Sequence, residues 1–171
     1  MREMFKKTKK EVKAPKVRKF AQVTDTKYGD ILINRLINSL MWDGKKTVAE
    51  TIVYKAIEII KNHDSIPKAI GEVELVKTIV TKIKPSVEVV SRRIRGATYP
   101  IPMEIRPHRA EMLALRWLRM GARSRGREMY KALAQEMIDA YNETGSAHKK
   151  RSDMHAMAKA SRSWAHFATS R

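Results

Sequence analysis

The chain has 171 residues, a formal net charge of +18 at pH 7 and no cysteine. This length suits one domain with a real core plus a tail, and the missing cysteines exclude disulfides, a thiolate nucleophile and the cysteine ligands of common zinc modules. The charge exceeds what solubility requires and indicates a polyanionic partner, with nucleic acid favoured over an anionic membrane surface.

The first predicted element is a basic N-terminal arm. Residues 1–20 contain nine Lys and Arg against two Glu, a net charge of +7, with few apolar residues. Such a block cannot bury enough surface to offset its ordering entropy, so we predict that residues 1–23 are disordered until bound. We expect no signal peptide here, and no run in the chain approaches the roughly 18 apolar residues that span a bilayer. The candidate binding residues of the arm are Lys6, Lys7, Lys9, Lys10, Lys16, Arg18 and Lys19.

Three amphipathic helices are predicted at the start of a single domain that spans residues 24–171. Apolar residues at helical spacing follow Asp30, a candidate N-cap. Thr47 and Glu50 match a capping box ahead of a second apolar stripe. A third stripe ends before Pro85, because the residue preceding a proline disfavours the helical conformation.

A β-hairpin is predicted next, at about residues 86–105. Two runs that alternate at period two are joined at a turn that contains Gly96. Pro100 and Pro102 lie two residues apart, so one edge of the second strand lacks N–H donors and cannot pair with a further strand. We therefore expect the ribbon to stand alone and to reach a polyanion, although a solvated arginine-rich loop is the alternative. The cationic residues near its turn are Arg92, Arg93 and Arg95.

Three more helices complete the prediction. They run from Pro107 to about Arg123, from about Glu128 to Tyr141, and from about Lys149 to Phe167. The fold class that follows is mainly α, a bundle of about six helices with a protruding two-stranded β-hairpin between the third and fourth helices.

The positive charge is unevenly distributed over these elements. Residues 30–83 carry eight basic and seven acidic side chains, whereas residues 84–131 carry twelve and four, and residues 145–171 carry six and one. The first of these segments is therefore predicted to be scaffold, and the other two to supply binding surfaces.

The helix after Pro107 has the most distinctive charge pattern. Steps of about 100° per residue place Trp117 on an apolar side that we expect to be core. The opposite side carries Arg109, Arg116, Arg119 and Arg123. Guanidinium groups pair bidentately with phosphate, so this stripe is a candidate phosphate-binding face, with an ordinary solvated face as the alternative.

The final helix is predicted to dock on one side and to offer cations on another. Its basic side repeats His155, Lys159, Arg162 and His166 at spacings of four, three and four. Trp164 near the C-terminus is either core or a platform for a stacked base.

Catalytic patterns are poor. Asp153, His155 and Ser161 supply the residue types of a triad, but all three lie on one predicted helix without a nucleophile elbow. No phosphate-binding glycine motif occurs, and the histidines lack metal-binding spacing with carboxylates. We therefore expect no catalytic residue, no metal, no cofactor and no small-molecule substrate.

Several blocks together resemble the bacterial-type small-subunit ribosomal protein seven family, from about residue 28 to residue 167. They are DGKKTVAETIVYKAIE at 43–58, PSVEVVSRRIRGATYPIPMEIRPHR at 85–109, LALRWL at 113–118 and HKKRSDMHAMAKASRSWAHF at 148–167. The resemblance implies six helices with a β-ribbon between the third and fourth. It also implies binding to the 3′ major domain of small-subunit rRNA, early assembly of the subunit head beside neighbouring proteins, and a ribbon near the exit-site tRNA and the mRNA exit path.

Site residues follow from the matching motifs. The resemblance implies rRNA contacts at Lys45 and Lys46 in the first block, at Arg106 and Arg109 in the second, and at Lys149, Lys150 and Arg151 in the last. It implies that Arg92, Arg93 and Gly96 belong to the ribbon, where Arg95 stands in place of a glycine of the family's tip. A ribosome of this type occurs in the bacterial cytoplasm or inside an organelle (mitochondrion or plastid), and the resemblance is compatible with either location. The alternative from a different class is a basic helical protein that binds duplex DNA as an architectural or regulatory factor.

Overall fold

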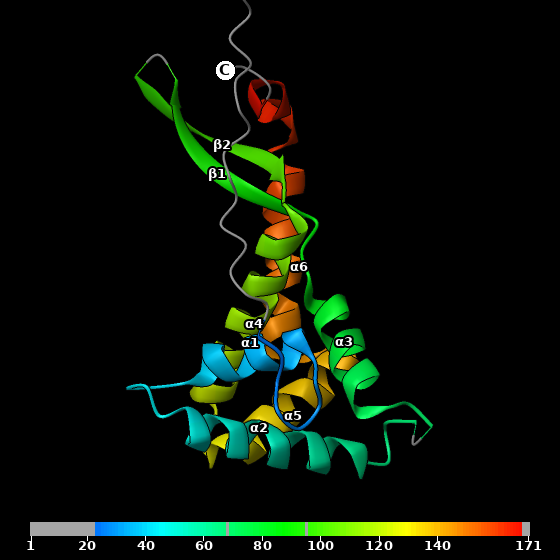
Figure 1. Cartoon of the computed structure of the whole chain (residues 1–171). Coiled ribbons are helices and arrows are strands. Elements are labelled where there is room, and N and C mark those ends of the chain that lie inside the picture. Colours follow the sequence, from blue (N-terminus) through cyan, green and yellow to red (C-terminus); the bar gives the residue numbers. More distant parts are fainter. Residues whose placement is uncertain (1–22, 68, 95, 169–171) are drawn as a thin grey trace, which may run out of the picture.

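The computed structural model describes residues 23–67, 69–94 and 96–168. Six α-helices, one two-stranded ribbon and a final 3₁₀ helix make up this part of the chain (Figure 1). The elements are α1 (Ile31–Leu40), α2 (Lys46–Lys61), α3 (Glu72–Ile83), β1 (Val87–Ile94), β2 (Ala97–Glu104), α4 (Pro107–Ser124), α5 (Met129–Tyr141), α6 (Gly145–Ala160) and η1 (Arg162–Ala168). The predicted fold class, with a hairpin between the third and fourth helices, is confirmed. The predicted N-terminal arm lies outside the described residues, apart from Val23.

Local sequence signals explain where several helices begin. The Asp30 carboxylate accepts a hydrogen bond from the Leu32 N–H at 2.7 Å and so caps α1 as predicted. Pro107 occupies the first turn of α4, where its missing N–H costs nothing. Glu72 and Glu74 lie in the first turn of α3, where the helix dipole favours negative charge.

The core surrounds α5, which packs against α2, α3, α4 and α6. Figure 1 shows α5 between α2 at one end of the bundle and the lower parts of α4 and α6. Its inward residues are nearly all completely buried: Ala132, Leu133, Ala134, Met137, Ile138 and Ala140. Small residues on this helix let its neighbours approach closely, so one central helix holds these four helices in fixed relative positions.

The ribbon pairs in antiparallel register, with Ile94 opposite Ala97 and Val90 opposite Ile101. Pro100 and Pro102 face Ser91 and Val89, and the described residues contribute no third strand, as predicted. The ribbon does not stand alone as expected, because η1 and α6 pack against it (Figure 1).

The fully buried Ile101 shows how closely the ribbon is packed. A helical cover of this kind stabilises a hairpin that would be marginal in water.

Two predicted helix boundaries are also wrong. Thr47 lies inside α2, because a turn in which the Lys45 N–H donates to the Trp42 carbonyl starts the helix at Lys46, and no capping box forms. The last α-helix begins at Gly145 and breaks at Ser161, before a 3₁₀ segment, so it is shorter at its C-terminal end than predicted.

Candidate nucleic-acid interface

A groove of about 670 Å³ lies between α1 and α4. Four arginines line it, together with apolar and polar side chains of both helices; they are Arg35, Arg109, Arg116 and Arg119. Val23 also lines the groove, and its carbonyl accepts a hydrogen bond from the Asn34 side chain at 2.6 Å. The N-terminal arm therefore joins the described fold at this groove.

Arg116, Arg119 and Arg123 form a cationic face on α4. Arg119 donates to the Ser39 carbonyl at 2.9 Å and Arg123 to the Leu40 carbonyl at 3.2 Å, whereas Arg116 is exposed. These carbonyls end α1, where the helix dipole favours positive charge. No Asp or Glu within the described ranges forms an ion pair with any of the three.

The pKa of Arg119 shows the effect of this crowding. Burial lowers the pKa of its guanidinium, and the neighbouring charges of Arg123 and Arg116 lower it further. Its Nε is buried without a hydrogen-bond partner. Three like charges held together on one face would be stabilised by an anion.

The flanking arginines are already paired with acids. The Arg35 guanidinium contacts Glu111, and the Arg109 Nε bonds both carboxylate oxygens of Glu88 at 2.8 and 3.0 Å. Arg109 therefore ties α4 to β1 and, unlike Arg116, Arg119 and Arg123, has a carboxylate partner.

Helix α6 contributes a second group of cations. Lys149 is exposed, and the Lys150 Nζ lies 3.8 Å from the Met120 Sδ on α4. Arg151 helps to line a small pocket of about 210 Å³, and its buried Nε has no hydrogen-bond partner. The three cations predicted at the start of the last helix thus lie about one turn inside α6.

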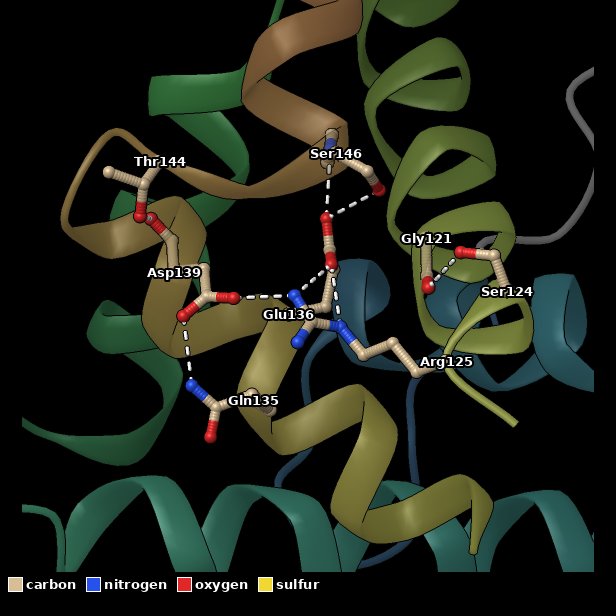
Figure 2. Close-up of polar contacts among 9 residues, drawn as sticks. Gly121, Ser124, Arg125, Gln135, Glu136, Asp139, Thr144 and Ser146 are labelled. Atoms are coloured by element: carbon tan, nitrogen blue, oxygen red, sulfur yellow. Dashed lines mark hydrogen bonds and ion pairs between the residues drawn. The ribbon is translucent and has the colours of Figure 1, made fainter. Parts of the chain in front are cut away.

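A buried acidic network fixes where α6 begins (Figure 2). The fully buried Glu136 accepts hydrogen bonds from the Ser146 hydroxyl at 2.9 Å, the Ala147 N–H at 2.8 Å and the Arg125 guanidinium at 2.6 and 3.0 Å. Arg125 also pairs with Asp139 at 2.5 Å. Burial lowers the pKa of Arg125, but its bonds to Glu136 and Asp139 outweigh this and raise it overall.

The sequence reasoning missed this network. One available signal was a Glu between the apolar residues Leu133 and Met137 of a predicted helix face; another was Gly121 inside a helix. A Cβ at Gly121 would lie 2.3 Å from the Ser146 Oγ and 2.6 Å from Glu136, so the glycine leaves room for the network. The network thereby positions the helix that carries Lys149, Lys150 and Arg151.

The remaining predicted cations lie on exposed turns. Lys45 and Lys46 are exposed at the start of α2, where Lys46 lies 3.7 Å from Glu50, and Arg106 is exposed at the start of α4. In the ribbon, Arg93 is exposed and Arg92 is partly buried opposite Tyr99. Gly96 has φ +91°, which the turn requires and glycine tolerates, and the predicted contact at Arg95 lies outside the described residues.

The aromatic residues are divided between the core and the ribbon. Trp117 is buried, as predicted. Trp164 packs on Tyr99 with 4.5 Å between ring centroids and stacks on Phe167 at 6.1 Å. These contacts hold η1 against β2, so Trp164 supports the ribbon.

Catalytic groups are not assembled in the described part of the chain. His155 accepts a hydrogen bond from the Ser86 N–H at 3.3 Å, and none joins it to Asp153 or Ser161 there. Within residues 23–67, 69–94 and 96–168, no three acidic or histidine side chains gather as metal ligands, and no helix is both long and apolar enough to cross a bilayer. A helical scaffold whose arginine face has no carboxylate partner in these residues, together with a ribbon that exposes Arg93, is typical of structural proteins that bind nucleic acid.

The chain belongs to the ribosomal protein S7p/S5e family, whose model matches residues 8–162. It is 46% identical to small ribosomal subunit protein uS7 of Fervidobacterium nodosum over 144 residues, which cover 84% of this chain and 90% of that protein. It is 47% identical to the uS7 protein of Petrotoga mobilis, with 85% and 92% covered, and 43% identical to that of Methylobacterium nodulans, with 85% and 91% covered.

This membership identifies a component of the small ribosomal subunit with a structural and not an enzymatic role. The predicted family is confirmed, and the alternative of a DNA-binding regulator is set aside.

Proposed function

We propose that the protein binds the 3′ major domain of small-subunit rRNA, nucleates assembly of the subunit head, and places its ribbon near the exit-site tRNA and the mRNA exit path. The carrying observation is the cationic face of Arg116, Arg119 and Arg123, which has no carboxylate partner in the described residues. RNA phosphates supply the missing negative charge, and guanidinium forks suit their geometry.

Several separate surfaces take part in this proposal. The α4 face and the groove beside α1 bind one stretch of RNA, while Lys45 and Lys46 bind phosphates at the opposite end of α1 from its N-cap. Helix α6 binds another stretch of RNA through Lys149, Lys150 and Arg151, which lie near its start. Folded RNA surrounds a protein on several sides, whereas a DNA duplex meets one face, so this distribution favours rRNA.

The N-terminal arm extends the groove contact in our proposal. The arm binds rRNA, because the charge of +7 on residues 1–20 attracts phosphates. Arg106, Arg109 and the arm lysines then bind beside the α4 face. Neighbouring head proteins are further partners, and the compartment is a bacterial cytoplasm or an organelle with a bacterial-type ribosome.

Two measurements test the proposal. The protein should sediment with small subunits through a gradient at moderate salt, and it should bind a 3′ major domain transcript with an affinity that falls steeply as salt rises. A DNA duplex of equal length is the competitor. Failure to sediment with small subunits, or equal affinity for the duplex, would overturn the proposed function.

A further inference from the structure

Trp42 is the most exposed of the large apolar side chains in the described residues, with 65% of its surface accessible. It lies in the turn between α1 and α2, immediately before Asp43 and Gly44. The ring belongs to no part of the core cluster. A ligand that covered this apolar surface would gain the free energy of removing it from water.

The ring is nevertheless held in place. The Arg123 guanidinium lies over it, 4.8 Å from the ring centroid, and is itself fixed by its bond to the Leu40 carbonyl. The Lys45 N–H closes the turn on the Trp42 carbonyl at 3.0 Å. Arg123 covers one face of the indole, so the large accessible fraction belongs mainly to the other face and the edges.

The surroundings of the open face decide which ligand fits. Lys45 and Lys46 follow in the same turn and are exposed, and Arg119 is close enough to Arg123 to feel its charge. The acids nearest in sequence are Asp43 and Glu50, and Glu50 is paired with Lys46. A protein partner would favour an apolar rim around a central tryptophan, whereas an aromatic ring among cations is the arrangement that binds an unpaired base and its phosphates.

We propose that Trp42 is a stacking platform for an unpaired nucleobase of the small-subunit rRNA. The base covers the open face of the indole while Arg123 covers the other, and Lys45 and Lys46 bind the adjacent phosphates. This inference rests on the proposed rRNA binding and adds a specific contact to it.

The test uses the full chain and a transcript of the 3′ major domain of bacterial small-subunit rRNA. Trp42→Ala should weaken binding by about 5-fold to about 150-fold, the range for loss of one base-aromatic stack, and the salt dependence should stay unchanged. Trp42→Phe should retain most of the affinity. Ile59→Ala is the matched control, because it truncates another exposed apolar side chain at the far end of α2 and should bind as the wild type does.

Fluorescence supplies a second readout. RNA should quench the emission of the wild type more than that of Trp42→Phe, because a stacked base quenches an indole and the other two tryptophans are unchanged. Equal affinity and equal quenching in the wild type and Trp42→Ala would overturn the stacking platform alone. Normal transcript binding by Trp42→Ala with poor entry into subunits would instead assign the ring to a protein partner. A wild type without salt-dependent binding would overturn the proposed function itself.

Discussion

Arg119 donates from its Nη1 to the Ser39 carbonyl at 2.9 Å, and this bond joins the cationic face of α4 to the C-terminal end of α1. The same guanidinium keeps a buried Nε without a partner. Arg119 thus contributes to the packing of the bundle as well as to the proposed interface, whereas its neighbour Arg116 is exposed and has no such structural bond in the described residues.

Charge reversal at these two positions should therefore have different effects. Arg116→Glu should weaken rRNA binding and reduce the slope of log affinity against log salt by about one unit, with an unchanged melting temperature. Arg119→Glu should weaken binding and also lower the melting temperature, because the α1 contact is lost. Lys131→Glu on α5 makes the same charge change outside the groove and should leave the slope unchanged. Equal salt slopes for Arg116→Glu and the wild type would show that Arg116 is not part of the interface.

The network around Glu136 predicts that replacement of a helical glycine by alanine lowers the free energy of unfolding, which is opposite to the usual effect. Glycine to alanine inside a helix normally stabilises by about 1 kcal/mol, but Gly121→Ala should destabilise by about 1–3 kcal/mol, since its Cβ meets Ser146 and Glu136. Chemical denaturation measures the change. Met120→Ala, at the adjacent exposed position, should be close to neutral. A stabilised Gly121→Ala variant would show that the network has room to move.

The same network illustrates what the sequence could and could not predict. Glu136 stands out in an apolar stripe, so its burial was open to prediction, but its partners come from the end of α4 and the start of α6. The 3₁₀ segment after Ser161 likewise packs through Trp164 on Tyr99, which lies in a distant part of the chain. Local patterns found the ribbon and Pro107, because alternation and proline act within a few residues.

The arginine face shows the same contrast between local patterns, which the sequence predicts, and tertiary partners, which it does not. Helical spacing placed Arg109, Arg116, Arg119 and Arg123 together, and all four lie on α4 as expected. Their different partners depend on which elements pack beside α4. Strand β1 brings Glu88 to Arg109, and α1 brings its last carbonyls to Arg119 and Arg123. Spacing along one helix carries no information about these neighbours.

Shortening the ribbon should separate binding from translation. Arg92 and Tyr99 pair directly, so replacement of residues 93–98 by Asn-Gly leaves a two-residue turn in the same hydrogen-bonding phase. Tyr99 stays against Trp164, and circular dichroism and rRNA affinity should remain close to wild type. Subunits that contain this variant should hold exit-site tRNA less well or misplace mRNA near its exit, in a filter-binding or crosslinking assay.

A second ribbon variant supplies the control for this experiment. Arg95→Asn gives the turn the sequence Asn-Gly and keeps the ribbon length, so this variant should retain more tRNA than the shortened form. If the shortened protein does not enter subunits at all, the ribbon is an assembly element and the proposed separation is wrong.

Asp30 predicts how stability depends on pH. Burial raises the pKa of its carboxyl, but Lys77 at 2.6 Å and the Leu32 N–H outweigh burial and hold the pKa below its ordinary value of 3.8. A lowered folded pKa means that the stabilisation is fully present above about pH 3.8 and is lost as the pH falls through the folded value.

Two substitutions separate the contribution of the ion pair from that of the helix cap. Asp30→Asn keeps the helix cap and loses the ion pair with the half-exposed Lys77, so it should cost at most about 1 kcal/mol at pH 7. Asp30→Ala should cost about 1 kcal/mol more, because the cap is lost too. The difference between the wild type and Asp30→Asn in urea unfolding should shrink below pH 3.8; a difference that grows there would contradict the assignment.

Pro100 and Pro102 have a consequence for the isolated protein. A newly made chain with a protruding ribbon offers a template on which identical ribbons can add and grow into fibres. Both prolines lie opposite residues of β1 and remove donors from the outer edge of β2, so that growth has no continuous hydrogen-bond ladder on this side. The two prolines thereby limit edge-to-edge association between copies of this chain.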